Sequence, residues 1–161
     1  MIANAVLRAA LWLLLAPAAA ALAAPPAGFV KPGKEEKCPV CGMFVHKYPE
    51  WTAQVVFKDG SRRVFDGAKD LFRFLADMRS YGVKLGRGDV AAVFVIDYYT
   101  LEPIDGAAAH YVAGSDVYGP MGKELIPFAL RADAEEFLRD HRGRRIVGFG
   151  EVEPELGTLD E

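Results

Sequence analysis

Two thiols and a thioether lie within one short segment whose proline and glycine predict a turn. They are Cys38, Cys41 and Met43, in the stretch CPVCGM at residues 38–43. Thiolate and thioether sulfur are soft ligands that select Cu(I) over harder ions, and the thiolate is the form that binds. Cys41 and Met43 are two positions apart, so in an extended chain their side chains project to the same side. The pattern therefore predicts a sulfur-rich Cu(I) site.

Three further side chains are candidate ligands from other parts of the chain. Met121 lies on a second Pro/Gly loop, at residues 119–122, which is an unusual place for an apolar side chain. His46 is close to the cysteines in sequence, and His110 lies on a predicted strand. A place in the core is the alternative for Met43 and Met121. A surface or structural role is favoured for each histidine over metal binding.

The C-x-x-C spacing of the cysteines has other meanings. Structural zinc needs four ligands, usually from two such pairs, and this sequence has only two cysteines and three scattered histidines. Thioredoxin-type redox chemistry places the motif at the start of a helix, whereas Cys38 opens the fold. A disulfide between Cys38 and Cys41 also remains open in an oxidising compartment. The alternative to a copper carrier is thus a thiol-disulfide oxidoreductase or a metal-dependent enzyme using this motif.

Composition excludes other classes of function. The formal net charge of −3 argues against nucleic acid as a partner. The sequence has no G-x-S-x-G elbow and no glycine-rich phosphate loop, so neither an active site nor a small-molecule substrate is predicted. We interpret Asp66 and Asp133 as helix caps. The residues therefore predict a metal-binding protein and not an enzyme.

The N-terminal segment, residues 1–23, is predicted to be a signal peptide. Arg8 precedes an apolar run at residues 9–16, and Ala-Leu-Ala at residues 21–23 fits the small-residue cleavage rule. The run is shorter than the roughly 20 residues that a membrane-spanning helix needs. We expect export to the periplasm or another extracytoplasmic part of the envelope. Retention of the uncleaved segment as a membrane tether is the alternative.

The rest of the chain predicts an α+β fold. Pro, Gly and charged residues predict a flexible linker at residues 24–36, and residues 154–161 are a predicted tail. Between them we expect two β-β-α-β units, at residues 37–88 and 89–153. The expected strands and helices are 52–57, 62–65 and helix 68–78 in the first unit, and 90–98, 110–112, 125–130, helix 134–140 and 146–149 in the second. The recurring order of strand, cap and helix suggests a weak internal duplication, with the halves facing one another across a cleft.

A series of short motifs runs from Cys38 to Glu151. They are Cys41-Gly42-Met43, Pro49, Trp51, Phe65-Asp66-Gly67, Lys69-Asp70, Tyr111-Val112, Gly114-Ser115, Gly119-Pro120-Met121-Gly122, Pro127-Phe128 and Ala132-Asp133-Ala134. Together these motifs resemble the NosL family, accessory proteins of nitrous oxide reductase maturation. The resemblance implies tandem β-β-α-β units similar to the organomercurial lyase fold. It also implies a Cu(I) site with Cys41, Met43 and Met121 as its main ligands.

The resemblance further implies a client and a setting. The client would be a copper enzyme, nitrous oxide reductase, loaded through a membrane-associated assembly complex. Two features depart from the family pattern. Many members are lipoproteins, whereas no Cys ends the apolar run of this N-terminal segment. Cys38 adds a second thiol, which joins the Cu(I) site, forms a disulfide with Cys41, or marks a branch that serves a different cuproprotein.

Overall fold

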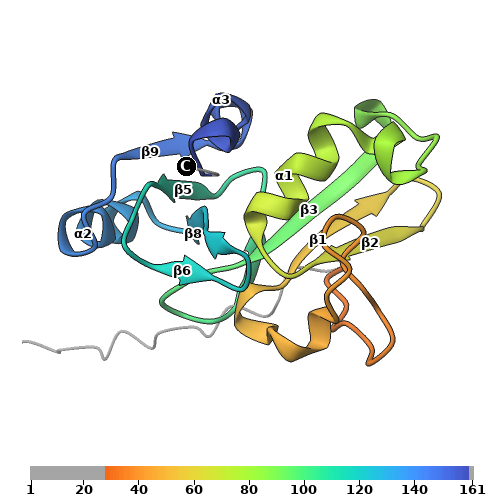
Figure 1. Ribbon diagram of the computed structural model, residues 1–161, viewed down its shortest axis with the longest axis horizontal. Helices are drawn as coiled ribbons and strands as arrows, with labels where there is room; N and C mark the ends of the chain where they lie inside the picture. Colours follow the sequence, from red (N-terminus) through yellow and green to blue (C-terminus); the bar gives the residue numbers. More distant parts are fainter. Residues whose placement is uncertain (1–27, 160–161) are drawn as a thin grey trace, which may run out of the picture.

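The computed structural model describes residues 28–159, in which most strands belong to two antiparallel sheets (Figure 1). The predicted signal peptide and the first residues of the predicted linker lie outside this range. This mixture of helices with antiparallel sheets agrees with the predicted α+β class.

The first sheet has the strand order β2-β1-β3-β4. Its strands are β1 (Ala53–Phe57), β2 (Arg62–Phe65), β3 (Val90–Ile96) and β4 (Pro103–Asp105). Gly60 adopts a φ of +83° in the turn between β1 and β2, a backbone conformation that glycine tolerates without strain. The predicted Asp-Gly hairpin is therefore confirmed.

The second sheet has the order β8-β5-β9, and a small hairpin projects beside it. The sheet strands are β5 (His110–Ala113), β8 (Ile126–Phe128) and β9 (Arg145–Gly148). The hairpin consists of β6 (Tyr118–Gly119) and β7 (Gly122–Lys123), with Met121 in its turn. The sequence patterns did not predict this hairpin, because it contains no hydrophobic run.

Each sheet is accompanied by one of the longer helices. These are α1 (Ala68–Ala76), which packs against β1 and β2, and α2 (Arg131–Asp140), which packs against the second sheet. A short helix α3 (Glu153–Leu156) contacts α1 near the C-terminus. Single 3-10 turns occupy Val45–Lys47, Pro49–Trp51, Met78–Tyr81, Arg87–Asp89, Phe149–Glu151 and Gly157–Leu159. No helix of the described residues is long and apolar enough to cross a membrane.

The order β-β-α-β occurs in both halves, as β1-β2-α1-β3 and β5-β8-α2-β9. In both, the first strand lies between the other two. β3, which follows the expected boundary at residue 88, pairs with β1, with Val93 opposite Val55. The first sheet therefore continues through β4. The likeness to the organomercurial lyase fold stays a prediction.

Both predicted helix caps are wrong. The N-cap of α1 is Gly67, and that of α2 is Leu130, so Asp66 precedes its helix and Asp133 lies inside the first turn. Neither N-cap position makes a side-chain capping bond. The Asp66 carboxylate is thus available for other contacts.

The predicted linker and tail both belong partly to the folded structure. The amide side chain of Gln54 on β1 exchanges two hydrogen bonds with the backbone of Val30. At the other end, Leu159 is buried in the main core, and Glu155 forms ion pairs with Arg144 and Arg145. Composition alone missed these contacts because they join segments far apart in the sequence.

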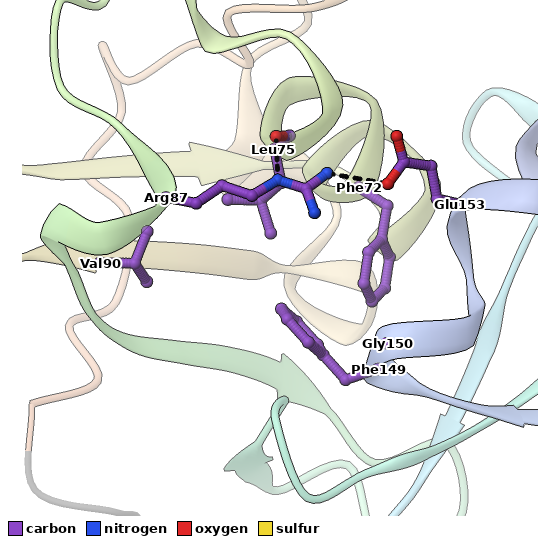
Figure 2. Close-up of a pocket in the computed structure, with 7 residues that line it drawn as sticks. All are labelled: Phe72, Leu75, Arg87, Val90, Phe149, Gly150 and Glu153. Carbon is purple, nitrogen blue, oxygen red and sulfur yellow. Dashed lines mark hydrogen bonds and ion pairs between the residues drawn. The ribbon is translucent and has the colours of Figure 1, made fainter.

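The main hydrophobic core includes residues from both halves. Phe72 of α1 packs edge-on against Tyr111 of β5 at 5.0 Å between ring centroids, and also contacts Phe149. A cavity of about 120 Å³ remains at this junction. Figure 2 shows its lining, closed on one side by the Arg87–Glu153 ion pair at 3.1 Å. Neither cysteine lines this cavity. Outside the cavity, the two halves meet through packed side chains of the main core.

Candidate metal centre

The cysteines are brought together by a tight turn of the backbone. Lys37 and Phe44 form an isolated bridge, and inside it the Cys38 N–H donates to the Met43 carbonyl at 2.9 Å. The Gly42 N–H donates back to the Cys38 carbonyl, also at 2.9 Å, with a φ of +80°. Because this φ suits glycine and strains other residues, Gly42 allows the turn that places both thiols on one side.

Two carboxylates face the two thiols. The Cys41 thiol donates to Asp66 Oδ1 at 3.1 Å, and the Cys38 thiol donates to Asp70 Oδ2 at 3.3 Å. Asp66 follows β2 and Asp70 lies in the first turn of α1, so the junction between strand and helix presents both. One ligand atom from each of the four residues lies within 4.8 Å of the others. Their spacing would allow a single ion to be held.

Burial keeps the thiols protonated. Cys38 is 1 % exposed and Cys41 is half-buried. Burial raises the pKa of Cys41 to about 12, with the Asp66 carboxylate adding to the effect, and burial also raises the pKa of Cys38. A metal ion that binds here must displace these protons, because the thiolate is the binding form.

One oxygen of the cluster has no partner among the described residues. Asp66 Oδ2 is buried and accepts no hydrogen bond there, although its other oxygen binds the Cys41 thiol. A buried carboxylate oxygen without a partner is costly, and metal binding is one way to satisfy it. The four side chains therefore fit a cation in both geometry and chemistry.

For the two predicted thioether ligands, Met43 and Met121, the contacts to the site are made by backbone carbonyl groups. Met43 is half-buried, and its carbonyl forms part of the cysteine turn. Met121 is 43 % exposed, and its carbonyl accepts a hydrogen bond at 2.8 Å from Lys69 Nζ, in the same first turn of α1 that carries Asp70. The main chain of Met43 thus belongs to the cysteine turn, and that of Met121 is bonded to a side chain of the helix that carries Asp70. Their role as ligands stays a prediction.

The two histidines lie outside the group of two thiols and two carboxylates. His46 borders an open cavity of about 770 Å³ that contains neither cysteine, and its ring packs edge-on against Phe44. His110 begins β5, opposite Phe128 of β8 and Gly148 of β9. Neither histidine is part of the metal-binding group found within residues 28–159.

Sequence reasoning missed Asp66 and Asp70 because it assigned acidic residues to caps and helix surfaces. A usable signal was present: the two residues are four positions apart across the start of an amphipathic helix, with hydrophobic neighbours on both sides. Asp66 comes directly after a predicted strand and Asp70 lies in the first turn of the following helix, so both fall at one strand–helix junction. That the cysteine turn packs against this junction could not be deduced from spacing.

A family model and individual relatives match this chain. The model of the NosL family matches residues 29–157. The chain belongs to the NosL family. The predicted resemblance is therefore confirmed, and it covers nearly all the described residues.

One curated protein and one crystal structure are similar to this NosL-family chain. The copper-binding lipoprotein NosL of Stutzerimonas stutzeri is 30 % identical over 122 residues, which cover 75 % of this chain and 64 % of that protein. This chain thus spans somewhat under two thirds of the length of that curated relative. The crystal structure of the copper chaperone NosL from Shewanella denitrificans matches with a TM-score of 0.66 and 26 % identity, covering 79 % of this chain and 96 % of that one.

Proposed function

We propose that this chain is a metallochaperone that binds copper as Cu(I) at Cys38 and Cys41 and transfers it to a client protein. The observation that carries the proposal is the pair of thiols held beside two buried carboxylates, within reach of one ion. Soft sulfur ligands favour Cu(I). The names of the two relatives describe copper binding and copper delivery, which supports copper as the cargo.

The carboxylates suit the loading of a carrier. Asp66 and Asp70 already accept hydrogen bonds from the two thiol protons, so they are placed to receive these protons as sulfur takes up the metal. We further propose that Met43 and Met121 add thioether ligands. Met121 would then belong to a surface loop, from which a client can approach the ion.

The structure argues against thiol exchange as the main activity. An attacking cysteine must be accessible and have a lowered pKa, whereas Cys38 is buried and burial raises the pKa of both thiols. The motif also lies in a hairpin-like turn and not at the start of a helix. The arrangement is better suited to holding a metal ion than to attacking a disulfide.

The proposal extends to place and partner. We propose that residues 1–23 direct export to the periplasm or another extracytoplasmic compartment, and that the client is nitrous oxide reductase with its membrane-associated assembly complex. The apolar N-terminal run and the family membership support this assignment. Maturation of nitrous oxide reductase in cells that carry or lack the gene tests the client directly.

Metal binding is tested by titrating the reduced protein with Cu(I) in the presence of a competing chelator of known affinity. We expect one Cu(I) per chain, bound far more tightly than Zn(II), because two thiolates favour the softer ion. Zn(II) competing equally well, with a tetrahedral all-protein site, would contradict the copper assignment.

A further inference from the structure

The first turn of α1 and the β6–β7 hairpin are joined by two buried ionisable side chains. Glu124, just after β7, accepts the backbone N–H of Lys69 at 2.5 Å and that of Leu125 at 2.9 Å, both on Oε1. In the reverse direction, Lys69 Nζ donates to the Met121 carbonyl at 2.8 Å. Lys69 and Glu124 are each 3 % exposed. Each half of the molecule thus supplies an ionisable group to the backbone of the other.

Two glycines leave room for this arrangement. A Cβ at Gly67 would lie 2.1 Å from Glu124 Oε2, and one at Gly119 would lie 3.0 Å from Glu124 Cγ. Both positions are therefore too crowded for a larger side chain while the carboxylate occupies its place. Glu124 supplies the capping acceptor that the N-cap residue of α1 lacks.

The buried ammonium group of Lys69 is bonded to a turn at the surface of the protein, which is unusual for a contact that serves only the fold. Burying an ammonium group is costly, and here it donates to the carbonyl of a residue in a tight surface turn. The side chain of that residue, Met121, stays 43 % exposed and is not part of either core. The backbone of Met121 is fixed while its thioether remains accessible.

Two hydrogen bonds and a short stretch of backbone link this turn to the thiols. The Met121 carbonyl binds Lys69, which follows Asp66 by three residues, and Asp66 accepts the Cys41 thiol. Figure 1 shows the hairpin beside the start of α1, the end of the helix at which the cluster lies.

We propose that Lys69 and Glu124 are positioning residues that hold the Met121 thioether at the cysteine site, so that Met121 can bind the captured Cu(I). The proposal rests on the proposed copper function. It adds two residues, Lys69 and Glu124, that touch no metal and act through Met121.

A double-mutant cycle tests this proposal with Cu(I) as the probe. Lys69→Leu removes the ammonium group and leaves an apolar side chain that carries no sulfur atom. We expect it to weaken Cu(I) binding about tenfold in the wild-type background, a loss of about 1.4 kcal/mol of binding free energy. In the Met121→Leu background the same change should weaken binding less than about twofold, because the ligand that Lys69 positions is already absent.

Thermal unfolding separates positioning from simple support of the fold. Lys69→Leu should lower the melting temperature equally in both backgrounds, whereas only its effect on Cu(I) affinity should depend on Met121. An equal loss of affinity in both backgrounds, or no loss in either, would overturn the proposal.

A second pair of variants gives the same test if Lys69→Leu fails to fold. Glu124→Gln keeps an acceptor oxygen and should retain Cu(I) affinity, while Glu124→Leu has no acceptor and should lose affinity only when Met121 is present. The copper function fails separately: if Cys41→Ser binds Cu(I) as tightly as the wild type, the site itself is misassigned. If Cys41→Ser loses binding and the cycles are additive, only the positioning role is wrong.

Discussion

At the scale of single residues, the two cysteines differ in their surroundings. Cys38 is buried in the main core beside Asp70, whereas Cys41 is half-buried and faces Asp66, whose second oxygen lacks a partner among the described residues. An incoming ion can reach Cys41 with less rearrangement. Cys41 is therefore expected to contribute more to binding than Cys38.

Single serine substitutions test this difference. Cys41→Ser should weaken Cu(I) binding by more than about a hundredfold, because a neutral hydroxyl does not replace a thiolate. Substitution of a residue that only hydrogen-bonds to a ligand usually costs less than this. Cys38→Ser should lose less affinity than Cys41→Ser, because Cys41 and the proposed thioether ligands Met43 and Met121 remain. Chelator competition measures both affinities. Complete loss in both variants, together with disulfide reductase activity in the wild type, would instead support an oxidoreductase.

At the scale of elements, the start of α1 is stabilised by a buried carboxyl from the other half. Burial raises the pKa of Glu124 to about 7, although the N–H groups of Leu125 and Lys69 and the Lys69 charge act in the opposite direction; Asp70 adds to the rise. In the unfolded chain this carboxyl would titrate near its ordinary value of 4.5. Its protonation is thus linked to folding.

The sign of this linkage gives a pH prediction. Between about pH 4.5 and 7 the folded protein holds the Glu124 proton that the unfolded chain has lost, so this group's stabilising contribution falls as the pH rises. The stability advantage of the wild type over Glu124→Gln should decline across that window by up to about 1.4 kcal/mol per pH unit. Urea unfolding at several pH values measures it. A difference that is constant, or that grows with pH, would show that the pKa of Glu124 is not raised.

At the scale of the whole molecule, the two halves share one main core. Phe72, Tyr111 and Phe149 meet where α1 packs against the second half, and Leu159 near the C-terminus is buried in the same cluster. A smaller cluster lies under α2 and includes Phe128 and Phe137. Because the main core joins both sheets, neither sheet should be stable when the other unfolds.

We therefore predict a single unfolding transition. Fluorescence of Trp51, the only tryptophan after residue 27, and far-UV circular dichroism should report the same midpoint. Phe72→Ala should lower stability by about 3–5 kcal/mol and shift both probes together. Leu130→Ala is a suitable control, because Leu130 is 60 % exposed and its loss should change stability by less than about 0.5 kcal/mol. Two separate midpoints would indicate independent halves.

The sequence by itself determined the local elements and the principal chemistry. The strand candidates on either side of the Asp59-Gly60 turn signal predicted the first hairpin. The stripe of Leu71, Phe72 and Leu75 predicted α1, and the motifs predicted the family. The sulfur atoms of Cys38 and Cys41 were recognisable because their spacing is short. Local signals of this kind depend on neighbours in the chain, so no tertiary information is needed to read them.

Only the tertiary structure decided what surrounds the thiols and where the halves join. Asp66 and Asp70 contact cysteines 25 and 32 residues away, and Glu124 caps a helix 55 residues away. The pairing of β3 with β1 and the burial of Leu159 likewise join distant segments. These contacts are set by how the sheets and helices pack around a shared core, and hydrophobic periodicity specifies which face of an element is buried but not which partner covers it.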